Sequence, residues 1–167
     1  MDRFFFDLTP LYSIIIPVHN EAKAIPELLD KLRVFSKAGH EILIIDDGST
    51  DNTANVIEGL CDRFSSVACI FNKEENGFGR AVNLGLKAFS GDAVAIMMAD
   101  QSDNPHDLVY YWKTLQEGHE CAFGSRFVSG GKVLNYPHLK LFMNRLVNSM
   151  IRFTFNINYN DTTNAFK

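Results

Sequence analysis

The chain has 167 residues, 46% of them hydrophobic and 22% charged, a composition typical of a soluble globular protein with a sizeable core. Its formal net charge of −4 gives no general attraction to nucleic acid, so we expect no nucleic-acid partner. No apolar run in the sequence approaches the roughly 20 residues that span a bilayer. These observations favour a soluble or peripheral protein.

The pattern of hydrophobic residues predicts alternating strands and helices in the first part of the chain. In chain order these are 12–18 (strand), 25–35 (helix), 41–45 (strand), 53–64 (helix), 67–72 (strand), 81–89 (helix) and 93–98 (strand). Such alternation predicts an α/β fold with a mainly parallel central sheet and helices on both of its faces.

The second part of the sequence has a different pattern. It predicts a helix at 107–115, a strand at 121–127, a glycine-containing loop at 128–136 and a long amphipathic helix at 139–155. The apolar side of this last helix suits either a protein core or the surface of a membrane, and the phenylalanines at 4–6 suit the same two places.

The cysteines Cys61, Cys69 and Cys121 are odd in number and widely spaced, which fits neither a disulfide framework nor a zinc site. We therefore predict three buried thiols and a cytoplasmic, reducing setting.

Polar clusters follow three of the predicted strands. Asn20-Glu21 comes after the first strand, Asp46-Asp47 after the second, and Asp100 after the fourth. Ligands of parallel sheets collect beyond the carboxyl ends of the strands, so these clusters are expected to face one crevice.

The acidic segment at 46–53 is the most informative of these clusters. A carboxylate at a strand end accepts hydrogen bonds from a ribose hydroxyl or a base N–H, and the glycine lets a ligand approach the backbone. The alternative is an acidic turn in which Ser49 or Asp51 caps the next helix. At least one of the two neighbouring aspartates is expected to be structural.

The segment at 100–103 offers oxygen ligands of the kind that bind Mg²⁺ or Mn²⁺ beside a diphosphate. Asp103 has an alternative role as a cap of the following helix. The loop at 77–80 lacks the pattern of a P-loop or a dinucleotide fingerprint, and is either a tight turn or a backbone cradle for a ligand.

Three cations in the second part are candidate phosphate ligands. Arg126 follows a predicted strand and can bind a phosphate bidentately, with a surface ion pair as the alternative. Lys140 and Arg145 lie on the long helix and offer positive charge for a second phosphate, with solvated side chains as the alternative. Among the histidines, His19 is a candidate pocket residue, and we expect the other four to lie on the surface.

Together these segments resemble a known family, the inverting glycosyltransferases of the GT-A fold (glycosyltransferase family 2), and within it the branch of dolichyl- and polyprenyl-phosphate sugar transferases. The resemblance runs from about residue 12 to the end. The segments that carry it are 17–21 (PVHNE), 46–53 (DDGSTDNT), 76–81 (NGFGRA), 99–100 (AD), 124–127 (GSRF), 130–131 (GG) and 160–167 (NDTTNAFK).

The resemblance implies a GT-A, three-layer α/β/α sandwich and a nucleoside-diphosphate sugar donor, linked to GDP or UDP. It implies that Arg126 and Lys140 face phosphates, that Asp100 binds Mg²⁺ or Mn²⁺, with Asp103 as a second candidate, and that residues 1–167 form a single catalytic domain that is truncated at the C-terminus. The residues expected to bind the nucleotide sugar are Pro17, His19, Glu21, Asp47, Ala99 and Asp100.

The sequence departs from the family at one place. Met98 stands where the family has the first acid of its Asp-x-Asp motif, and Ser102 stands at the position of a frequent glutamine on the metal side. This departure puts the strength of metal binding in question.

The predicted activity is the inverting transfer of a hexose from a nucleotide sugar to a lipid phosphate at the cytoplasmic face of a membrane, with peripheral membrane contact. A sugar hydroxyl as acceptor is a variant of this reading, which would require a carboxylate base. A nucleotide-sugar-binding module without turnover is the alternative, and an unrelated nucleotide-binding α/β protein is a more distant one.

Overall fold

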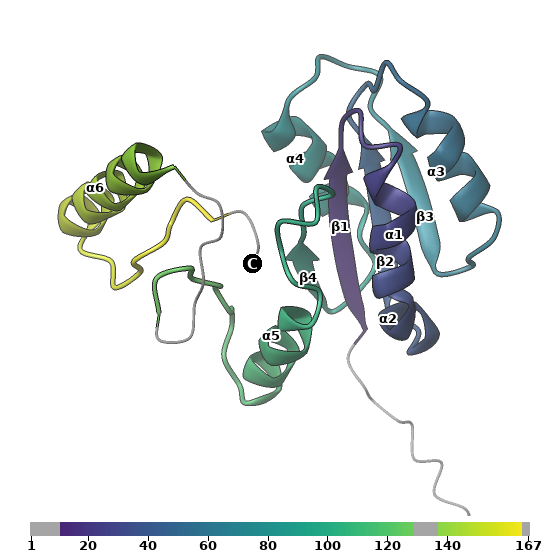
Figure 1. The fold of residues 1–167 in the computed structure, drawn as a ribbon. Helices are drawn as coiled ribbons and strands as arrows, with labels where there is room; N and C mark the ends of the chain where they lie inside the picture. Colours follow the sequence, from purple (N-terminus) through teal and green to yellow (C-terminus); the bar gives the residue numbers. More distant parts are fainter. Residues whose placement is uncertain (1–10, 129–136, 165–167) are drawn as a thin grey trace, which may run out of the picture. The chain divides into compact units, whose positions relative to one another are not determined.

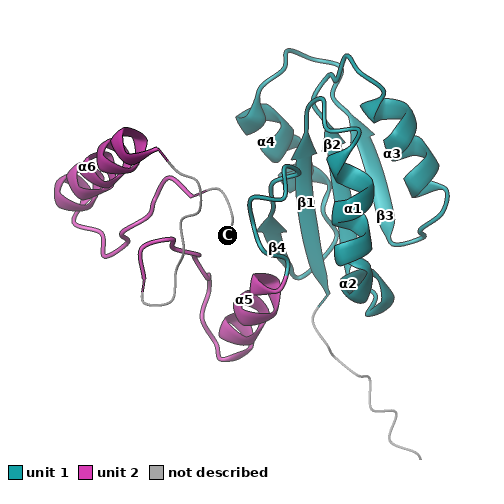
Figure 2. Ribbon diagram, in the orientation of Figure 1, with its two compact units in different colours: residues 1–105 teal, residues 106–167 magenta. Residues whose placement is uncertain are grey.

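The computed structural model describes residues 11–128 and 137–164 of the chain. It divides into two compact units, with the boundary between Pro105 and His106 (Figure 2). The phenylalanines at 4–6, the glycine pair at 130–131 and the segment 165–167 lie outside the described residues.

In the described part of the first unit, four parallel strands form one sheet in the order β3-β2-β1-β4. The strands are rich in β-branched and other apolar residues, which pack well on a pleated surface. Their bounds are Tyr12–Val18 (β1), Glu41–Asp46 (β2), Val67–Phe71 (β3) and Ala93–Ile96 (β4). All four lie where the sequence predicts strands.

Helix α4 (Phe78–Ala88) covers one face of this sheet (Figure 1). Side chains alternate between the two faces of a strand, and Ile15, Leu43 and Ile45 form a buried cluster with Ala81 of the helix. A Cβ at Gly85 would lie 2.6 Å from Cγ2 of Ile15. Glycine at this position therefore lets the helix pack directly against β1.

The helices on the opposite side of the sheet are α1 (Ala24–Lys31), α2 (Arg33–Lys37) and α3 (Thr53–Cys61) (Figure 1). The sequence predicts a single helix at 25–35, and this is wrong in one respect. Helix α1 ends at Lys31 and α2 begins at Arg33, with Leu32 as a turn residue between them, while the Leu32 side chain stays fully buried. The periodic spacing of apolar residues thus continues from α1 into α2, and it gives no sign that the helix is interrupted between them.

The second unit contains α5 (Asp107–Gln116) and α6 (His138–Phe155). The predicted strand at 121–127 is wrong, because this segment has no strand pairing in the structure. The backbone N–H of Arg126 donates to the Asp161 carboxylate, and that of Phe127 donates to the Ser125 hydroxyl. Within the described ranges, no helix is long and apolar enough to cross a membrane.

His40 is buried, although the sequence analysis expects it on the surface. Its ring packs edge-on against Tyr12, with centroids 5.4 Å apart, and also contacts Phe35. Burial lowers the pKa of His40 below its usual value, since the charged imidazolium would be poorly solvated there.

The cysteine prediction is also wrong. The end of α3 lies beside β3, and Cys61 and Cys69 form a disulfide with their Cα atoms 6.6 Å apart. Cys121 is an exposed free thiol. The cysteines therefore lend no support to the predicted cytoplasmic setting.

The order of the strands creates a topological switch point. The chain moves outward from β1 to β2 and β3, then returns to place β4 on the other side of β1. The crevice beyond the carboxyl ends of two such strands is where ligands of open α/β sheets bind.

Candidate functional site: a pocket at the switch point

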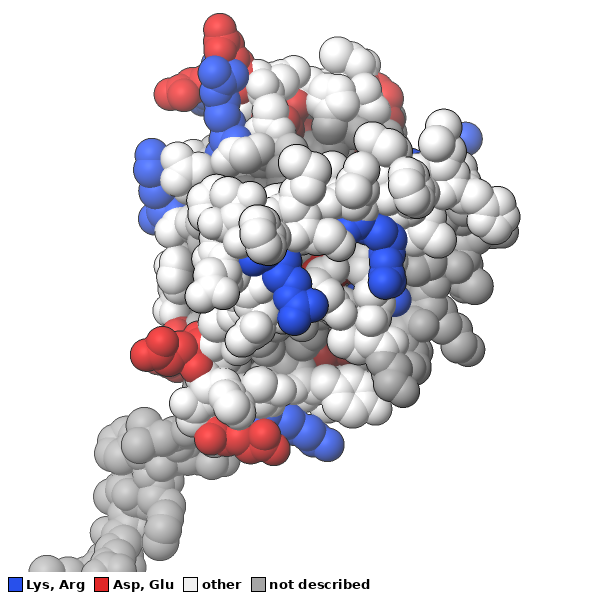
Figure 3. Space-filling model, turned by 90° about the vertical axis from the view of Figure 1, so that its left-hand side faces the viewer, with Lys and Arg blue, Asp and Glu red and all other residues white. Residues whose placement is uncertain are grey.

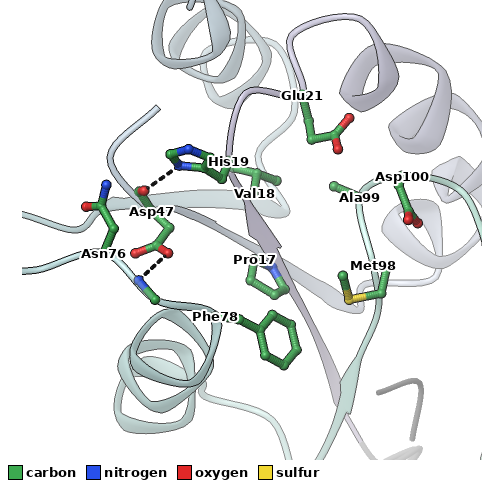
Figure 4. Close-up of a pocket in the computed structure, with 11 residues that line it drawn as sticks. Pro17, Val18, His19, Glu21, Asp47, Asn76, Phe78, Met98, Ala99 and Asp100 are labelled. Atoms are coloured by element: carbon green, nitrogen blue, oxygen red, sulfur yellow. Dashed lines mark hydrogen bonds between the residues drawn. The ribbon is translucent and has the colours of Figure 1, made fainter. Parts of the chain in front are cut away.

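A pocket of about 460 Å³ opens at this switch point, beyond the carboxyl ends of β1 and β4 (Figure 4). Its walls are formed by the last residues of β1, by residues that follow β1, β2 and β4, and by the loop between β3 and α4 with the first residue of α4. The lining residues are Pro17, Val18, His19, Glu21, Asp47, Asn76, Gly77, Phe78, Met98, Ala99 and Asp100. All six residues that the sequence analysis expects to bind the nucleotide sugar are among them.

The two adjacent aspartates after β2 have different surroundings. Asp46 lies within the strand, and its Oδ1 accepts hydrogen bonds from the Ser49 backbone and hydroxyl, which closes a turn. The Asp47 carboxylate accepts from Asn72 Nδ2 at 2.8 Å and from the Gly77 N–H at 2.7 Å. Asp46 is thus the structural aspartate, and Asp47 joins the β2 end to the β3–α4 loop.

Asp47 keeps the capacity to contact a ligand. An ionised carboxylate has about four acceptor positions, and the protein bonds of Asp47 occupy two of them. The residue lines the pocket (Figure 4).

Two further contacts shape the loop at 46–53. Gly48 adopts a left-handed φ of 64°, and a Cβ at this position would collide with the Asn76 side-chain amide. Asp51 accepts a hydrogen bond at 2.9 Å from the N–H of Thr53, the first residue of α3, while the N-cap position itself is Asn52, whose side chain makes no capping bond. Hydrogen bonds from Thr53 lower the pKa of the Asp51 carboxyl.

The loop after β4 is held against helix α1. Gln101 adopts a left-handed φ of 61°, and its Nε2 donates to Glu27 Oε2 at 3.1 Å and to the Ala24 carbonyl at 3.4 Å. The Lys31 ammonium donates to Gln101 Oε1. These bonds fix the residue that directly follows Asp100.

The acidic residues of this loop differ in their contacts. Asp100 lines the pocket, and its Oδ1 accepts from the Ser102 N–H at 2.9 Å. Asp103 is not among the residues that line the pocket, and its Oδ2 accepts from the Met98 N–H at 3.2 Å. The N-cap residue of α5 is His106, three residues after Asp103, and the His106 side chain makes no capping hydrogen bond.

Hard oxygen donors at this place suit Mg²⁺ or Mn²⁺. In the described part of the chain, no group of three or more His, Cys, Asp and Glu side chains is arranged to hold a metal ion. Mg²⁺ is usually bound by one or two carboxylates, and takes its remaining ligands from water and substrate phosphates. The single carboxylate of Asp100 at the pocket wall fits that kind of site.

Five of the lining residues are not among the site residues expected from the sequence, although a backbone cradle for a ligand was one of the two interpretations of the loop at 77–80. Val18, Asn76, Gly77, Phe78 and Met98 all line the pocket. The signal for Asn76 to Phe78 was the polar, glycine-containing loop directly after a strand. Phe78 is 47% exposed, and its ring lies near Pro17 and Met98 at the pocket wall (Figure 4).

The predicted phosphate-binding cations belong to the second unit. Arg126 forms a bidentate ion pair with Asp161, with Nε–Oδ2 and Nη2–Oδ1 distances of 2.8 and 2.6 Å. Burial acts to raise the pKa of Asp161, but the hydrogen bonds and charge of Arg126 outweigh burial and lower it. Lys140 is an exposed residue on α6.

A scan against protein-family models matches residues 13–167 to "Glycosyl transferase family 2". The pocket at the switch point of a parallel sheet is typical of ligand-binding α/β proteins, and the family match is more specific. The chain belongs to glycosyl transferase family 2.

Two curated relatives fall in the predicted branch. The dolichol-phosphate mannosyltransferase of Pyrococcus furiosus is 34% identical over 126 residues, covering 75% of this chain and 36% of the relative. The polyprenol monophosphomannose synthase of Mycolicibacterium smegmatis is 30% identical over 161 residues, covering 92% of this chain and 59% of the relative. The chain thus spans between about a third and three fifths of the length of these relatives.

Solved structures confirm the predicted GT-A fold. A mannosyltransferase from Pyrobaculum calidifontis in complex with GDP-Man and Mn²⁺ is 27% identical, with a TM-score of 0.50 over 55% of this chain and 28% of that one. TarS from S. aureus in complex with UDP-GlcNAc is 26% identical, with a TM-score of 0.54 over 64% of this chain and 31% of that one.

Proposed function

We propose that the protein transfers a hexose from a nucleoside-diphosphate sugar to a polyprenyl phosphate, with inversion at the anomeric carbon. The observation that carries this proposal is the pocket at the switch point, with Asp47 on one wall and Asp100 on the other (Figure 4). The family and the names of the two curated relatives support the same reaction.

In this proposal the nucleoside occupies the side of the pocket formed by Pro17, His19 and Asp47. The Asp47 carboxylate accepts a hydrogen bond from the base or the ribose, and Glu21 and Ala99 line the path toward the diphosphate. Figure 4 shows Asp47 and Asp100 on opposite sides of the pocket, which leaves room between them for a donor.

Asp100, with Asp103 as the second candidate, would hold a divalent cation against the donor diphosphate. When bound, this cation would neutralise negative charge that grows on the departing nucleoside diphosphate. The bonds of Gln101 to α1 keep Asp100 in place for this task. The proposal gives Arg126 and Lys140 the role of positive groups for phosphates.

A phosphate acceptor is already an anion and needs no strong general base. Its attack from the side opposite the diphosphate inverts the anomeric carbon. The second unit has a pocket of about 450 Å³ whose lining suits an apolar chain that ends in a phosphate. It is lined by Phe127, His138, Leu141, Phe142 and Arg145.

The proposal is tested by a thermal-shift panel with GDP-mannose, UDP-glucose and UDP-N-acetylglucosamine, each with Mn²⁺ and with EDTA. A ligand that binds only the folded state raises the melting temperature, and 100 Kd of ligand adds about 2.7 kcal/mol of stability. We expect at least one donor to stabilise the protein, and more strongly with Mn²⁺. The absence of any shift across the panel would contradict the proposal.

Met98 favours a second candidate function, a nucleotide-sugar-binding module without turnover. This residue lines the pocket at the position of the family's first metal-side acid. Both functions predict a thermal shift. Release of nucleoside diphosphate in the presence of a polyprenyl phosphate would distinguish the enzyme from the module.

We also propose that α6 brings the protein to an anionic membrane surface. One side of the helix carries seven apolar residues at three- and four-residue steps, and each is at least 40% exposed. They are Leu139, Phe142, Met143, Leu146, Val147, Met150 and Phe153. On the opposite side Asn148 is 2% exposed and accepts two hydrogen bonds from Thr162.

The charges of α6 complement an anionic bilayer. Lys140, Arg145 and Arg152 lie outside the apolar stripe, and the helix has no acidic residue. On the face shown in Figure 3, Lys and Arg side chains stand within a largely uncharged surface. Basic amphipathic helices with such a pattern lie in the bilayer interface.

Phe153, which is 90% exposed, provides the test. We expect Phe153→Glu to weaken binding to phosphatidylglycerol vesicles about tenfold, because the change removes an aromatic side chain that the bilayer would bury and adds a charge that the anionic lipids repel. Vesicle co-sedimentation measures this effect. The matched control is Val34→Glu, at a 64% exposed position on α2, which should bind as the wild type does. A drop in melting temperature without weaker vesicle binding would instead place Phe153 within the protein fold.

A further inference from the structure

Asn20 is a residue whose side chain joins two loops at the mouth of the donor pocket. It follows β1 with a left-handed φ of 58°. Asparagine tolerates this conformation better than most residues other than glycine. Among the described residues it is not one of those that line the pocket, although its neighbour His19 is.

The first set of contacts reaches the loop after β2. Asn20 Oδ1 accepts from the Thr50 N–H at 2.7 Å and from the Asp51 N–H at 3.2 Å. The backbone N–H of Asn20 donates to the Ser49 hydroxyl at 2.9 Å. One residue therefore binds three successive residues of the loop that begins with Asp47.

The second contact reaches His19. Its Nδ1 lies 2.8 Å from the Asp47 carbonyl oxygen, which only accepts, so Nδ1 carries the proton. Asn20 Nδ2 lies 3.2 Å from His19 Nε2. Because Oδ1 is turned to the backbone N–H groups, the amide nitrogen faces the ring and donates to Nε2. The ring is thereby held in one tautomer and one orientation.

We propose that Asn20 is a positioning residue for the nucleotide-sugar donor. It acts through His19 and Asp47 by holding the β1–α1 and β2–α3 loops at a fixed separation. The inference rests on the proposed function, since it concerns the same pocket. Asn20 links the loop that carries His19 to the loop that carries Asp47, so that this side of the pocket is already formed before the donor binds.

Two substitutions separate the two sets of contacts. Asn20→Gly keeps the left-handed backbone and removes every side-chain bond. Asn20→Asp keeps an acceptor for Thr50 and Asp51 but has no donor for His19. The matched control is Asn156→Gly, which makes the same change at another left-handed asparagine, with φ of 50°, at the end of α6.

We expect Asn20→Gly to weaken the binding of GDP or UDP about tenfold, whichever the wild-type chain binds, because the three Oδ1 bonds to the loop and the His19 bond are lost. The affinity of Asn20→Asp should fall between those of Asn20→Gly and the wild type, and Asn156→Gly should bind as the wild type does. Titration calorimetry with Mn²⁺ measures the affinities, and the melting temperature of each variant is recorded separately.

Nitrogen-15 NMR of the His19 ring gives a readout that does not depend on any ligand. The wild type should show one protonated Nδ1 and one acceptor Nε2, and Asn20→Gly should show averaged tautomers. Wild-type affinity together with a single His19 tautomer in Asn20→Gly would overturn the inference. So would a lower melting temperature with unchanged affinity. If the wild type binds no nucleotide, the proposed function fails, and the His19 spectrum still tests the contact.

Discussion

Replacing Asp100 with asparagine is expected to lower sugar transfer by about 10²–10³-fold, because charge stabilisation by a bound cation is worth several kcal/mol at the transition state. Asparagine is nearly isosteric with aspartate, and its Oδ1 can still accept from the Ser102 N–H. The substitution therefore removes a charge at the pocket wall while the loop keeps its bonds. The measurement is transfer from the preferred nucleotide sugar to a polyprenyl phosphate, at several Mn²⁺ concentrations.

Asp92 gives a matched control for this variant. It precedes β4 at the opposite end of the same strand, and its Oδ2 accepts from the Leu11 N–H at 2.8 Å. Asp92→Asn should leave transfer unchanged. Asp103→Asn should cost less than Asp100→Asn, since the Asp103 carboxylate already binds the Met98 N–H. Full Mn²⁺-dependent activity in Asp100→Asn would refute its role as a metal ligand.

Replacing Asp161 with alanine is expected to destabilise the second unit by about 3–5 kcal/mol, the usual cost of breaking a buried ion pair by removing one partner. The Asp161 side chain is 1% exposed, and that of its partner Arg126 is 28% exposed. Its carboxylate also accepts from the Arg126 backbone N–H at 3.0 Å. Without it, a partly buried guanidinium and a backbone N–H both lose the carboxylate that they bind.

The tryptophan of the chain provides the measurement, because Trp112 lies in α5 of the second unit. Its emission in a urea titration should shift to a lower midpoint in Asp161→Ala. The matched control is Asp62→Ala, at an exposed position of the first unit, which should leave the Trp112 transition in place. An unchanged midpoint in Asp161→Ala would show that the ion pair contributes no stability.

The same pair predicts a dependence on pH. Contacts with Arg126 lower the pKa of Asp161 from its ordinary value of 3.8. A carboxyl whose pKa is lower in the folded state contributes stability above the unfolded pKa and loses it as the pH falls through the folded pKa. The Trp112 transition should therefore lose stability below about pH 4, and the loss should be smaller in Asp161→Ala.

The fold of the first unit was predictable because its signals are local. Each strand is a short apolar run that ends at a polar cluster, and each helix has one apolar side. The errors arise where a partner distant in sequence decides the outcome. The segment at 121–127 has the apolar residues of a strand, but the Arg126 N–H within it donates to the Asp161 carboxylate and not to a neighbouring strand. His40 is buried because Tyr12, at the start of β1, packs against it.

The site, too, was predictable where its signals are local and unpredictable where it depends on contacts between residues distant in sequence. The residues after β1, β2 and β4 could be assigned to one pocket because parallel strands end at one edge of the sheet. Phe78 could not be assigned, since its place depends on the bond between the Gly77 N–H and the Asp47 carboxylate, 30 residues away. The role of Asn20 depends on bonds that span about the same distance.

All eleven residues that line the pocket at the switch point come from residues 17–100, within the first unit. In the proposed function, the first unit alone therefore contacts the nucleoside, whereas the proposed phosphate-binding residues Arg126 and Lys140 belong to the second unit. Substitutions after Pro105 leave every residue that lines this pocket unchanged. A chimera that keeps residues 1–105 and exchanges the remainder should inherit its choice of nucleotide from this chain.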